Sequence, residues 1–193
     1  MKFLGLSLIL LGTLFQTDTW QWVKTVNGIS ISHLKDNSDG LIGYKCEMVM
    51  DQPMKQVEGY LDNLEDYPRW QENMTELKVI EKDNNVICYY YLFSDLPWPV
   101  SDREMVIKST KSSSKGKIEY HNWAINSEYE SGKTGVVRET NAQGYWAIIE
   151  ISPNRTKVIY SWKGRNSTAL PNWLVQEFIT TGPLKTMKNL KNL

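Results

Sequence analysis

The segment from Asp95 to Arg103 carries the residues of this sequence that most plainly could do chemistry. It reads Asp-Leu-Pro-Trp-Pro-Val-Ser-Asp-Arg, with two prolines one residue apart. A proline has no backbone N–H to donate to a neighbouring strand, so two prolines this close together are incompatible with a central strand. The segment is therefore predicted to be a rigid connection that precedes a strand beginning at Arg103. An arginine near a sheet interior needs a carboxylate, carbonyl oxygens or a ligand head group, because an unpaired buried charge is costly. Arg103 is therefore a candidate anchor in a cavity, and a structural ion pair with Asp102, Glu104 or a more distant acid is the alternative.

Other groups that could support catalysis are few. His33 and His121 both lie in predicted strands, with no Cys or His at metal-ligand spacing nearby. The sequence has no G-x-S-x-G motif, no Gly-rich phosphate loop and no H-E-x-x-H motif. We therefore expect no metal site, no cofactor and no catalytic residues of a known motif class.

The composition is that of an ordinary globular domain. The 193 residues suffice for one domain with a sizeable core, and 41% of them are hydrophobic and 23% charged. Lys plus Arg and Asp plus Glu both number 22, which argues against a nucleic-acid partner and against electrostatic docking on anionic membranes. The chain has eight Trp and ten Tyr but only four Phe. Trp and Tyr combine a large apolar ring with one hydrogen-bonding group, which suits the wall of a ligand pocket; the alternative is that they fill the core.

Residues 1–16 have the character of a signal peptide. Lys2 precedes a run of uncharged, mostly apolar residues that is too short for a comfortable membrane span. We expect cleavage near Gln16 and export to the periplasm or the outside, with an uncleaved weak anchor as the alternative. Cys46 and Cys88 both lie in apolar strand-like runs, so two buried free thiols are expected, although export permits a disulfide.

Turn residues and hydrophobic periodicity predict one domain without repeats. An Asn-Gly turn and the turn cluster 36–40 mark residues 28–50 as a hairpin. Asp51 and Pro53 are typical of a helix start, and Pro68 is expected to end that helix. A last helix should open at Pro171, after a flexible loop at 164–168, and break at Gly182-Pro183. Between the helices the period is two, which predicts an antiparallel meander with strands at 77–81, 86–93, 103–108, 116–125, 135–139, 145–151 and 156–162.

Strand periodicity also groups candidate side chains by face. Every second residue after Arg103 shares its face, namely Met105, Ile107 and Ser109. The residues between them include Glu104 and Lys108, whose charges suggest that the opposite face is solvated. The sequence leaves open which face of each strand points inward, and Trp146 is expected either to line a cavity or to fill the core.

Six short motifs follow one another along the chain. They are Trp22 with Gly28-Ile29, Asp62 with Tyr67-x-x-Trp70, Pro97-Trp98-Pro99-x-x-x-Arg103-Glu104, Val137-Arg138, Gly144-x-Trp146 and Leu170-Pro171-x-Trp173-Leu174-Val175. In this order they resemble START (StAR-related lipid transfer) domains, most closely the bacterial members, over residues 20–193. The resemblance implies an α+β helix-grip fold, in which a curved antiparallel sheet wraps around a long C-terminal helix with an interior cavity. The cavity would hold one sterol, phospholipid or other apolar molecule, and residues 164–170 would form its lid.

The resemblance also indicates which residues would meet the ligand. In several lipid-transfer members an acid on the preceding strand pairs with a base six residues after the motif arginine, and the corresponding positions here are Tyr90 and Ser109. The cavity floor is therefore expected to be neutral and rich in hydroxyl groups, with Arg103 at its edge, which weakens any carry-over of a specific ligand such as cholesterol. The candidate ligand-binding residues are Tyr90, Trp98, Arg103, Met105, Ile107, Ser109, Arg138, Trp146 and Trp173.

Three functions remain open at this level. The first is a monomeric carrier or sensor that binds a lipid or other hydrophobic molecule, touches membranes transiently and does no chemistry. The second is an enzyme like the polyketide cyclases of the same fold, with Arg103, Arg138, Tyr90 and His121 as candidate groups. The third is a protein of the cell envelope that binds other proteins, and a large exposed apolar patch would indicate this function.

Overall fold

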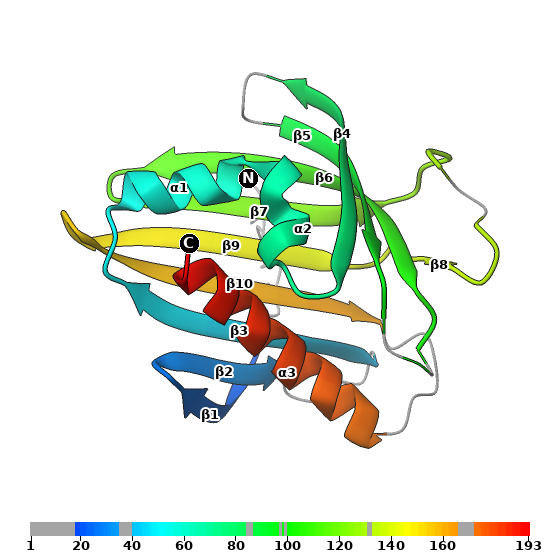
Figure 1. Ribbon diagram of the computed structural model, residues 1–193, viewed down its shortest axis with the longest axis horizontal. Coiled ribbons are helices and arrows are strands. Elements are labelled where there is room, and N and C mark those ends of the chain that lie inside the picture. The colour runs from blue at the N-terminus through cyan, green and yellow to red at the C-terminus, as the bar shows by residue number, and fades with distance from the viewer. Residues whose placement is uncertain are drawn as a thin grey trace, which may run out of the picture.

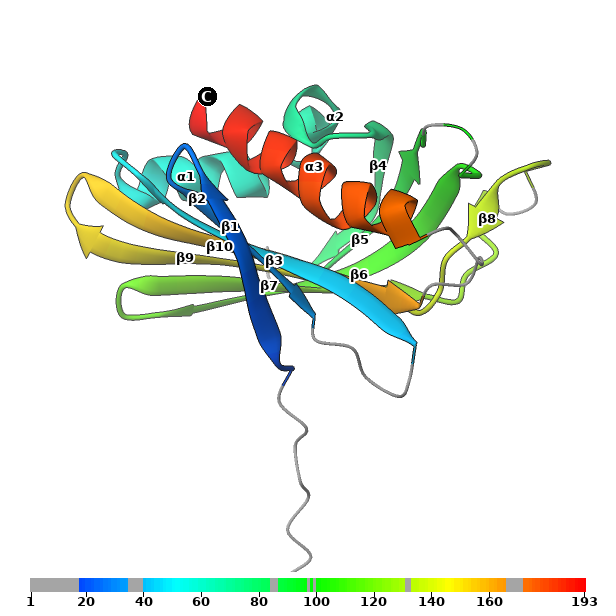
Figure 2. The same ribbon diagram turned by 90° about the horizontal axis from the view of Figure 1, so that it is seen from below.

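The computed structural model describes residues 18–34, 40–83, 87–96, 98, 100–130, 133–165 and 172–193. Helices lie on one side of a single strand-rich layer (Figures 1 and 2). The helices are α1 (Met54–Asp62), the 3-10 turn η1 (Leu64–Asp66), α2 (Tyr67–Trp70) and α3 (Asn172–Lys191). The strands are β1 (Trp20–Val26), β2 (Ile29–Leu34), β3 (Leu41–Met50), β4 (Met74–Asp83), β5 (Ile87–Ser94), β6 (Arg103–Ser114), β7 (Lys117–Ile125), β8 (Val137–Arg138), β9 (Gln143–Ser152) and β10 (Arg155–Arg165).

The strands form one sheet in the order β1-β2-β3-β10-β9-β7-β6-β5-β4, and all of these neighbours are antiparallel. The short β8 is off this path and pairs in parallel with β6. Register shifts in β1 and β4 mark bulges, which increase the twist at the two edges. The sheet curves around α3, which lies across its concave side (Figure 2). The predicted helix-grip architecture is confirmed.

Most strands follow the predicted periodicity, and the hairpin at 28–50 is confirmed as β2 and β3. Strand β1 was not predicted, because all of its residues but the first are exposed and no alternation of polar and apolar residues marks it. The predicted loop at 164–168 begins too early. Gly164 and Arg165 are still part of β10, paired with β3, and the rest of the predicted lid lies outside the described residues.

The first helix is shorter than predicted. It ends at Asp62, and Pro68 does not terminate it but lies in the first turn of α2. A proline is well tolerated there, because the first N–H groups of a helix have no partner inside the helix. The side chains of Tyr67 and Trp70 are both buried in the core between the helices and the sheet.

The last helix runs without a break through Gly182 and Pro183, contrary to the prediction. A proline inside a helix leaves the carbonyl of the residue four positions earlier without its usual donor, and here that residue is Ile179. His33 on β2 donates a hydrogen bond to this carbonyl. The helix therefore keeps its Pro183 because a side chain of the sheet supplies the missing donor.

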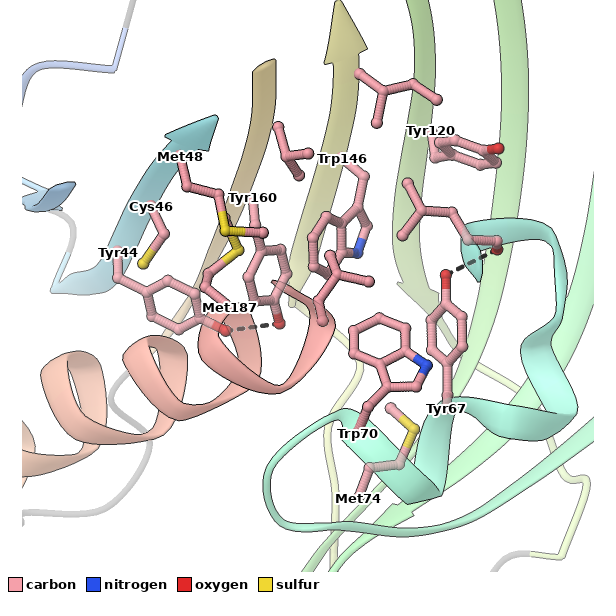
Figure 3. Close-up of a cluster of buried hydrophobic side chains, with 14 of the residues drawn as sticks. Tyr44, Cys46, Met48, Tyr67, Trp70, Met74, Tyr120, Trp146, Tyr160 and Met187 are labelled. Carbon is pink, nitrogen blue, oxygen red and sulfur yellow. Dashed lines mark hydrogen bonds between the residues drawn. The ribbon is translucent and has the colours of Figure 1, made fainter. Parts of the chain in front are cut away.

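An aromatic cluster fills the interior between α2 and the sheet (Figure 3). The indole of Trp70 meets that of Trp146 edge to face, with centroids 5.8 Å apart, and Trp146 stacks on Tyr160 at 3.9 Å. Cys46 and Cys88 are free and buried, as expected. In the part of the chain that the structure describes, no helix combines the length and apolar character needed to cross a bilayer.

Candidate ligand-binding cavity

A cavity of about 180 Å³ lies between the sheet, the connection from α2 to β4 and the middle of α3. Sites for drug-sized molecules occupy about 300–1,000 Å³, whereas an engineered cavity of about 150 Å³ binds benzene. The cavity as it stands therefore has room for a ring or a short chain. Its apolar wall comes from β3, β5, β6, β9, β10 and α3 through Ile42, Leu92, Met105, Ile107, Trp146, Trp162 and Pro183.

One end of the cavity is neutral and rich in hydrogen-bonding groups. Tyr44 Oη donates to Tyr160 Oη at 2.7 Å (Figure 3), and Gln71 Nε2 donates to the same oxygen at 3.4 Å. Tyr90 Oη donates to Asn122 Oδ1 at 3.5 Å on the neighbouring wall. Burial raises the pKa of Tyr160 to about 12 and that of Tyr44 well above its usual range. These phenols therefore stay protonated and act as neutral donors at physiological pH.

The other end of the cavity carries three charged residues, whereas the carboxylate of Glu72, which follows Gln71, is paired with Lys185 at 2.9 Å. Arg103, Glu139 and Arg165 border the cavity at this end. Arg103 Nη1 donates to the carbonyl of Ser101 at 2.9 Å, and burial lowers the pKa of the guanidinium, against the opposing charges of Glu139 and Asp102. Within the described residues no carboxylate oxygen lies within the 4.0 Å that defines an ion pair with Arg103. The predicted structural ion pair is thus not formed, and a ligand can reach this cation.

Five of the candidate residues meet in this cavity, namely Tyr90, Arg103, Met105, Ile107 and Trp146. Ser109 shares their face but lies farther along β6, paired with Cys88 and Asn122, and is not among the lining residues. Trp98 is 92% exposed. The side chain of Trp173 lies outside the described part of the structure.

Arg138 also lies away from the cavity, because it pairs with Glu104 on the opposite face of the sheet. Arg138 Nε donates to Glu104 Oε1 at 3.1 Å, and Tyr91 Oη donates to Glu104 Oε2 at 3.0 Å. Glu104 is only 1% exposed, so the expectation that this face is solvated is wrong at this position. The segment around Tyr129 and Arg138 covers it, with Arg138 Nη2 donating to the carbonyl of Tyr129.

Several cavity residues escaped the sequence analysis. Tyr44 and Tyr160 follow the period-two pattern of their strands, together with Cys46, Met48 and Val158, which are buried. That pattern could have identified both tyrosines. Gln71 follows α2 in an irregular connection where no periodicity applies, so only the structure brings it to the cavity.

A second hollow of about 300 Å³ lies on the outer face of the sheet, away from α3. Its walls include His121 and Tyr145, whose neighbours Tyr120 and Trp146 point inward. Two of its lysines are already neutralised by ion pairs, Lys45 with Glu47 and Lys163 with Asp18. The interior cavity is the better candidate site despite its smaller volume, because its lining is mainly apolar and comes from both the sheet and α3.

The comparisons with known proteins agree with this architecture. The family model of the START domain matches residues 13–192. An uncharacterized protein of Pseudomonas aeruginosa is 22% identical over 91% of this chain and 86% of its own, and the phosphatidylcholine transfer protein of mouse is 25% identical over 89% of this chain and 81% of its own.

Two solved structures have a similar fold. The STAR-related lipid transfer protein from Xanthomonas axonopodis superimposes with a TM-score of 0.78, at 23% identity, over 91% of this chain and 98% of its own. The Zhui aromatase/cyclase from a Streptomyces species superimposes with a TM-score of 0.58, at 10% identity, over 79% of this chain and 92% of its own. With a family model that spans nearly the whole sequence and a sheet that grips α3 around an interior cavity, the chain belongs to the START domain family.

Proposed function

We propose that this protein binds one hydrophobic small molecule in the interior cavity and carries it without chemical change. The observation that carries the proposal is an apolar wall with a neutral, hydrogen-bonding end, made by Tyr44, Tyr160 and Gln71. Such walls with a few placed polar groups are typical of small-molecule sites. The family membership and the lipid-transfer names of its relatives support the same conclusion.

The volume of about 180 Å³ limits what can enter without rearrangement. A long-chain ligand would have to extend beyond the cavity past the end bordered by Arg103, Glu139 and Arg165, or displace α3 from the sheet. Gly182 and Pro183 border the cavity at the middle of α3, where a helix bends most easily.

Native mass spectrometry of the purified protein, followed by lipid extraction, tests the proposal. We expect a bound apolar molecule at one copy per chain. Repeated recovery of protein without any such molecule, combined with no uptake of added lipid, would contradict it. Gel filtration in the same preparations checks the proposed monomer.

An enzyme of the cyclase type is the second candidate, because Arg103 and Tyr90 both line the cavity and the fold resembles that of an aromatase/cyclase. Tyr90 pairs with Ile107, which is four residues from Arg103 along β6, or about 13 Å at the rise of a strand. The other two candidate groups, Arg138 and His121, lie outside the cavity. Turnover of an aromatic polyketide-like substrate that is lost in a folded Arg103→Ala variant would favour this function over carriage.

We further propose that the protein touches membranes transiently through Trp98. This indole is 92% exposed, yet Leu96 and Val100 on either side of it border the cavity. Tryptophan favours the membrane–water interface, and a protein with no net charge gains little from anionic lipid. Trp98→Ser should therefore reduce sedimentation with neutral phosphatidylcholine vesicles, whereas Trp22→Ser, a 63% exposed tryptophan on β1, should not. Equal sedimentation of both variants would contradict the proposal.

The export of the protein is also a proposal. It rests on the apolar run after Lys2, which lies outside the described residues. N-terminal sequencing of the protein from its native cells tests it, with a mature end near residue 16 as the expected result. An intact Met1 on protein from the cytoplasmic fraction would contradict it.

A further inference from the structure

The hollow of about 300 Å³ on the outer face of the sheet spans β3, β10, β9 and β7. Three steps between neighbouring strands, at about 4.8 Å each, make it about 14 Å across. Asp18 and Trp20, at the start of β1, border it as well. Asn122 and Gly144 border both this hollow and the interior cavity, so the sheet alone separates the two spaces. The hollow is therefore a site of its own, on the opposite face of the sheet.

Aromatic rings line the hollow in a continuous row. His121 and Trp123 lie nearly parallel, with 14° between their planes and 5.7 Å between their centroids, and Tyr145 lies against His121 at 5.0 Å. Trp123 is 37% exposed, so part of its indole is open to a ligand. Rings of this kind offer an apolar surface on which a flat face of C–H groups can stack.

Polar side chains lie beside these rings. Ser161 is the cross-strand neighbour of Tyr145, and Gln143 is the neighbour of Trp123. Within the described residues no hydrogen bond engages the side chain of Ser161, Gln143 or His121. A hydroxyl, an amide and an imidazole together supply both donors and acceptors. A ligand rich in hydroxyl groups can bond to all three, because each hydroxyl donates and accepts.

The charges of the hollow are balanced. Lys163 Nζ lies 2.9 Å and 2.8 Å from the two carboxylate oxygens of Asp18, and Lys45 Nζ lies 3.0 Å from Glu47 Oε1. Lys45 also lies over the ring of Trp20, 6.0 Å from its centroid. An anion would compete with carboxylates already in place, and a cation would meet two ammonium groups. A hydrocarbon chain would cover the polar groups without bonding to them, which is costly. The observations favour a neutral, polar ligand.

We propose that the outer hollow is a second binding site, which takes a neutral sugar with equatorial hydroxyl groups. Both faces of such a ring carry C–H groups, so one face stacks on Trp123. The hydroxyl groups lie at the edge of the ring, where they meet Gln143 and Ser161. Every unit of β-linked glucose has this shape, and a span of about 14 Å favours a short oligomer over a single ring. The site is independent of the proposed carrier function, because its ligand does not enter the interior cavity.

A nuclear magnetic resonance titration of the isotope-labelled full chain with cellotriose tests the proposal. Each of the eight tryptophans gives one indole N–H signal, which single Trp→Phe variants assign. We expect the signals of Trp20 and Trp123 to shift as the sugar binds, and that of Trp146, which lines the interior cavity, to stay in place. No shift at Trp20 and Trp123 would overturn the proposal. A shift confined to Trp146 would place the sugar in the interior and overturn it as well.

Trp123→Ala should weaken cellotriose binding about tenfold, the effect of losing one stacked aromatic contact. Trp22→Ala is the matched control, because Trp22 is 63% exposed on β1 and does not border the hollow. 1-Octanol, a small apolar probe of the interior cavity, should bind both variants and the unmodified protein equally, which checks that the variants are folded. Equal cellotriose affinity in the two variants would overturn the assignment of the stacking ring. Should Trp123→Ala not fold, the titration of the unmodified protein decides alone.

Three single-unit probes test the class of ligand. Methyl β-glucoside is the neutral reference, sorbitol carries similar hydroxyl groups without a ring, and glucuronate keeps the ring and adds a negative charge. We expect methyl β-glucoside to shift the signals of Trp20 and Trp123 at lower concentration than either of the others. Equal binding of sorbitol would overturn stacking as the basis of recognition. Tighter binding of glucuronate would overturn the neutral class and indicate an anion site at Lys45 and Lys163.

Discussion

Gly164 sets the position of one wall of the cavity. A Cβ atom at this residue would lie 2.8 Å from two ring atoms of Trp162, closer than real Cβ atoms approach other atoms. The indole of Trp162 lines the cavity and stacks on Tyr44, with ring centroids 6.1 Å apart. The missing side chain at residue 164 therefore allows the indole to lie flat along β10.

Gly164→Ala should push the indole of Trp162 out of its place and weaken ligand binding. We expect the free energy of unfolding to fall by about 1–3 kcal/mol, as for overpacked cores, and the affinity for 1-octanol to fall severalfold. Urea unfolding and fluorescence titration measure the two effects. Gly59→Ala is the control, because nothing lies within 4 Å of the added methyl group. Wild-type affinity in Gly164→Ala would contradict the assignment of this wall.

Glu104 and Arg138 form a buried pair whose role is structural. The side chain of Glu104 is 2% exposed and that of Arg138 16% exposed, and neither residue lines the cavity. Removal of one partner from a buried pair costs more than the pair itself contributes, because the remaining charge is left unpaired.

Arg138→Met should lower the free energy of unfolding by about 3 kcal/mol and leave ligand affinity unchanged. Arg69→Met is the matched control, since Arg69 pairs with Asp66 but is 80% exposed, where a pair contributes at most about 1 kcal/mol. Urea midpoints with a common slope give both values. A folded Arg138→Met protein that no longer binds ligand would instead argue for the direct role in the cavity that the sequence had suggested.

At the scale of elements, α3 is hydrogen-bonded to the sheet at the point where Pro183 removes one of the hydrogen bonds inside the helix. His33 donates to the carbonyl of Ile179, which Pro183 cannot serve, and His33 Nε2 lies 2.9 Å from Thr180 Oγ1. With one ring nitrogen donating to a carbonyl, the other accepts from the threonine hydroxyl when the imidazole is neutral. Partial burial, together with the charge of Lys24, lowers the pKa of His33 below 6.5.

This lowered pKa predicts a loss of stability in mild acid. The unfolded chain binds a proton at His33 near pH 6.5 and the folded chain only at lower pH, so stability is complete above pH 6.5 and falls as the pH drops below it. Thermal melts between pH 7.5 and 5 should show this fall, and His33→Gln should flatten it. His121→Gln, which changes the other histidine on the outer face, should keep the wild-type slope. An unchanged slope in His33→Gln would refute the assignment.

At the scale of the whole molecule, the same packing of the sheet and α3 that forms the fold also forms the cavity. The sheet curves around α3, and the space left between them is where a ligand would bind (Figure 2). A ligand that binds only the folded chain stabilises it by mass action. Ligand occupancy and global stability should therefore change together.

Protein stripped of ligand should unfold at lower temperature than protein saturated with 1-octanol. At a concentration one hundred times the dissociation constant, stabilisation is about 2.7 kcal/mol, which is about 5–10 °C for a chain of this size. Differential scanning fluorimetry across a concentration series measures the shift. The shift should be smaller in Gly164→Ala than in Gly59→Ala at equal alcohol concentration, and equal shifts would contradict binding at this wall.

The sequence by itself determined the strand-rich class, most of the strands and the family. Period-two patterns are local, so β5, β7, β9 and β10 could be read directly, whereas β1 has no buried face and left no signal. The same locality placed Arg103, Met105 and Ile107 on one face. Tyr90 became a candidate through the family resemblance, and only the structure shows that Tyr90 and Trp146 line the same cavity.

Only the tertiary structure decided which polar groups meet in that cavity. Gln71, Tyr44 and Tyr160 come from three separate elements, and the contact of Tyr44 with Tyr160 joins residues 116 positions apart. Arg138 does not line the cavity, because its guanidinium pairs with Glu104 on the opposite face of the sheet. Hydrogen-bond partners depend on chain geometry across the whole fold, whereas faces and periods depend on neighbours in sequence, and this is why the wall of the cavity was predictable and its polar end was not.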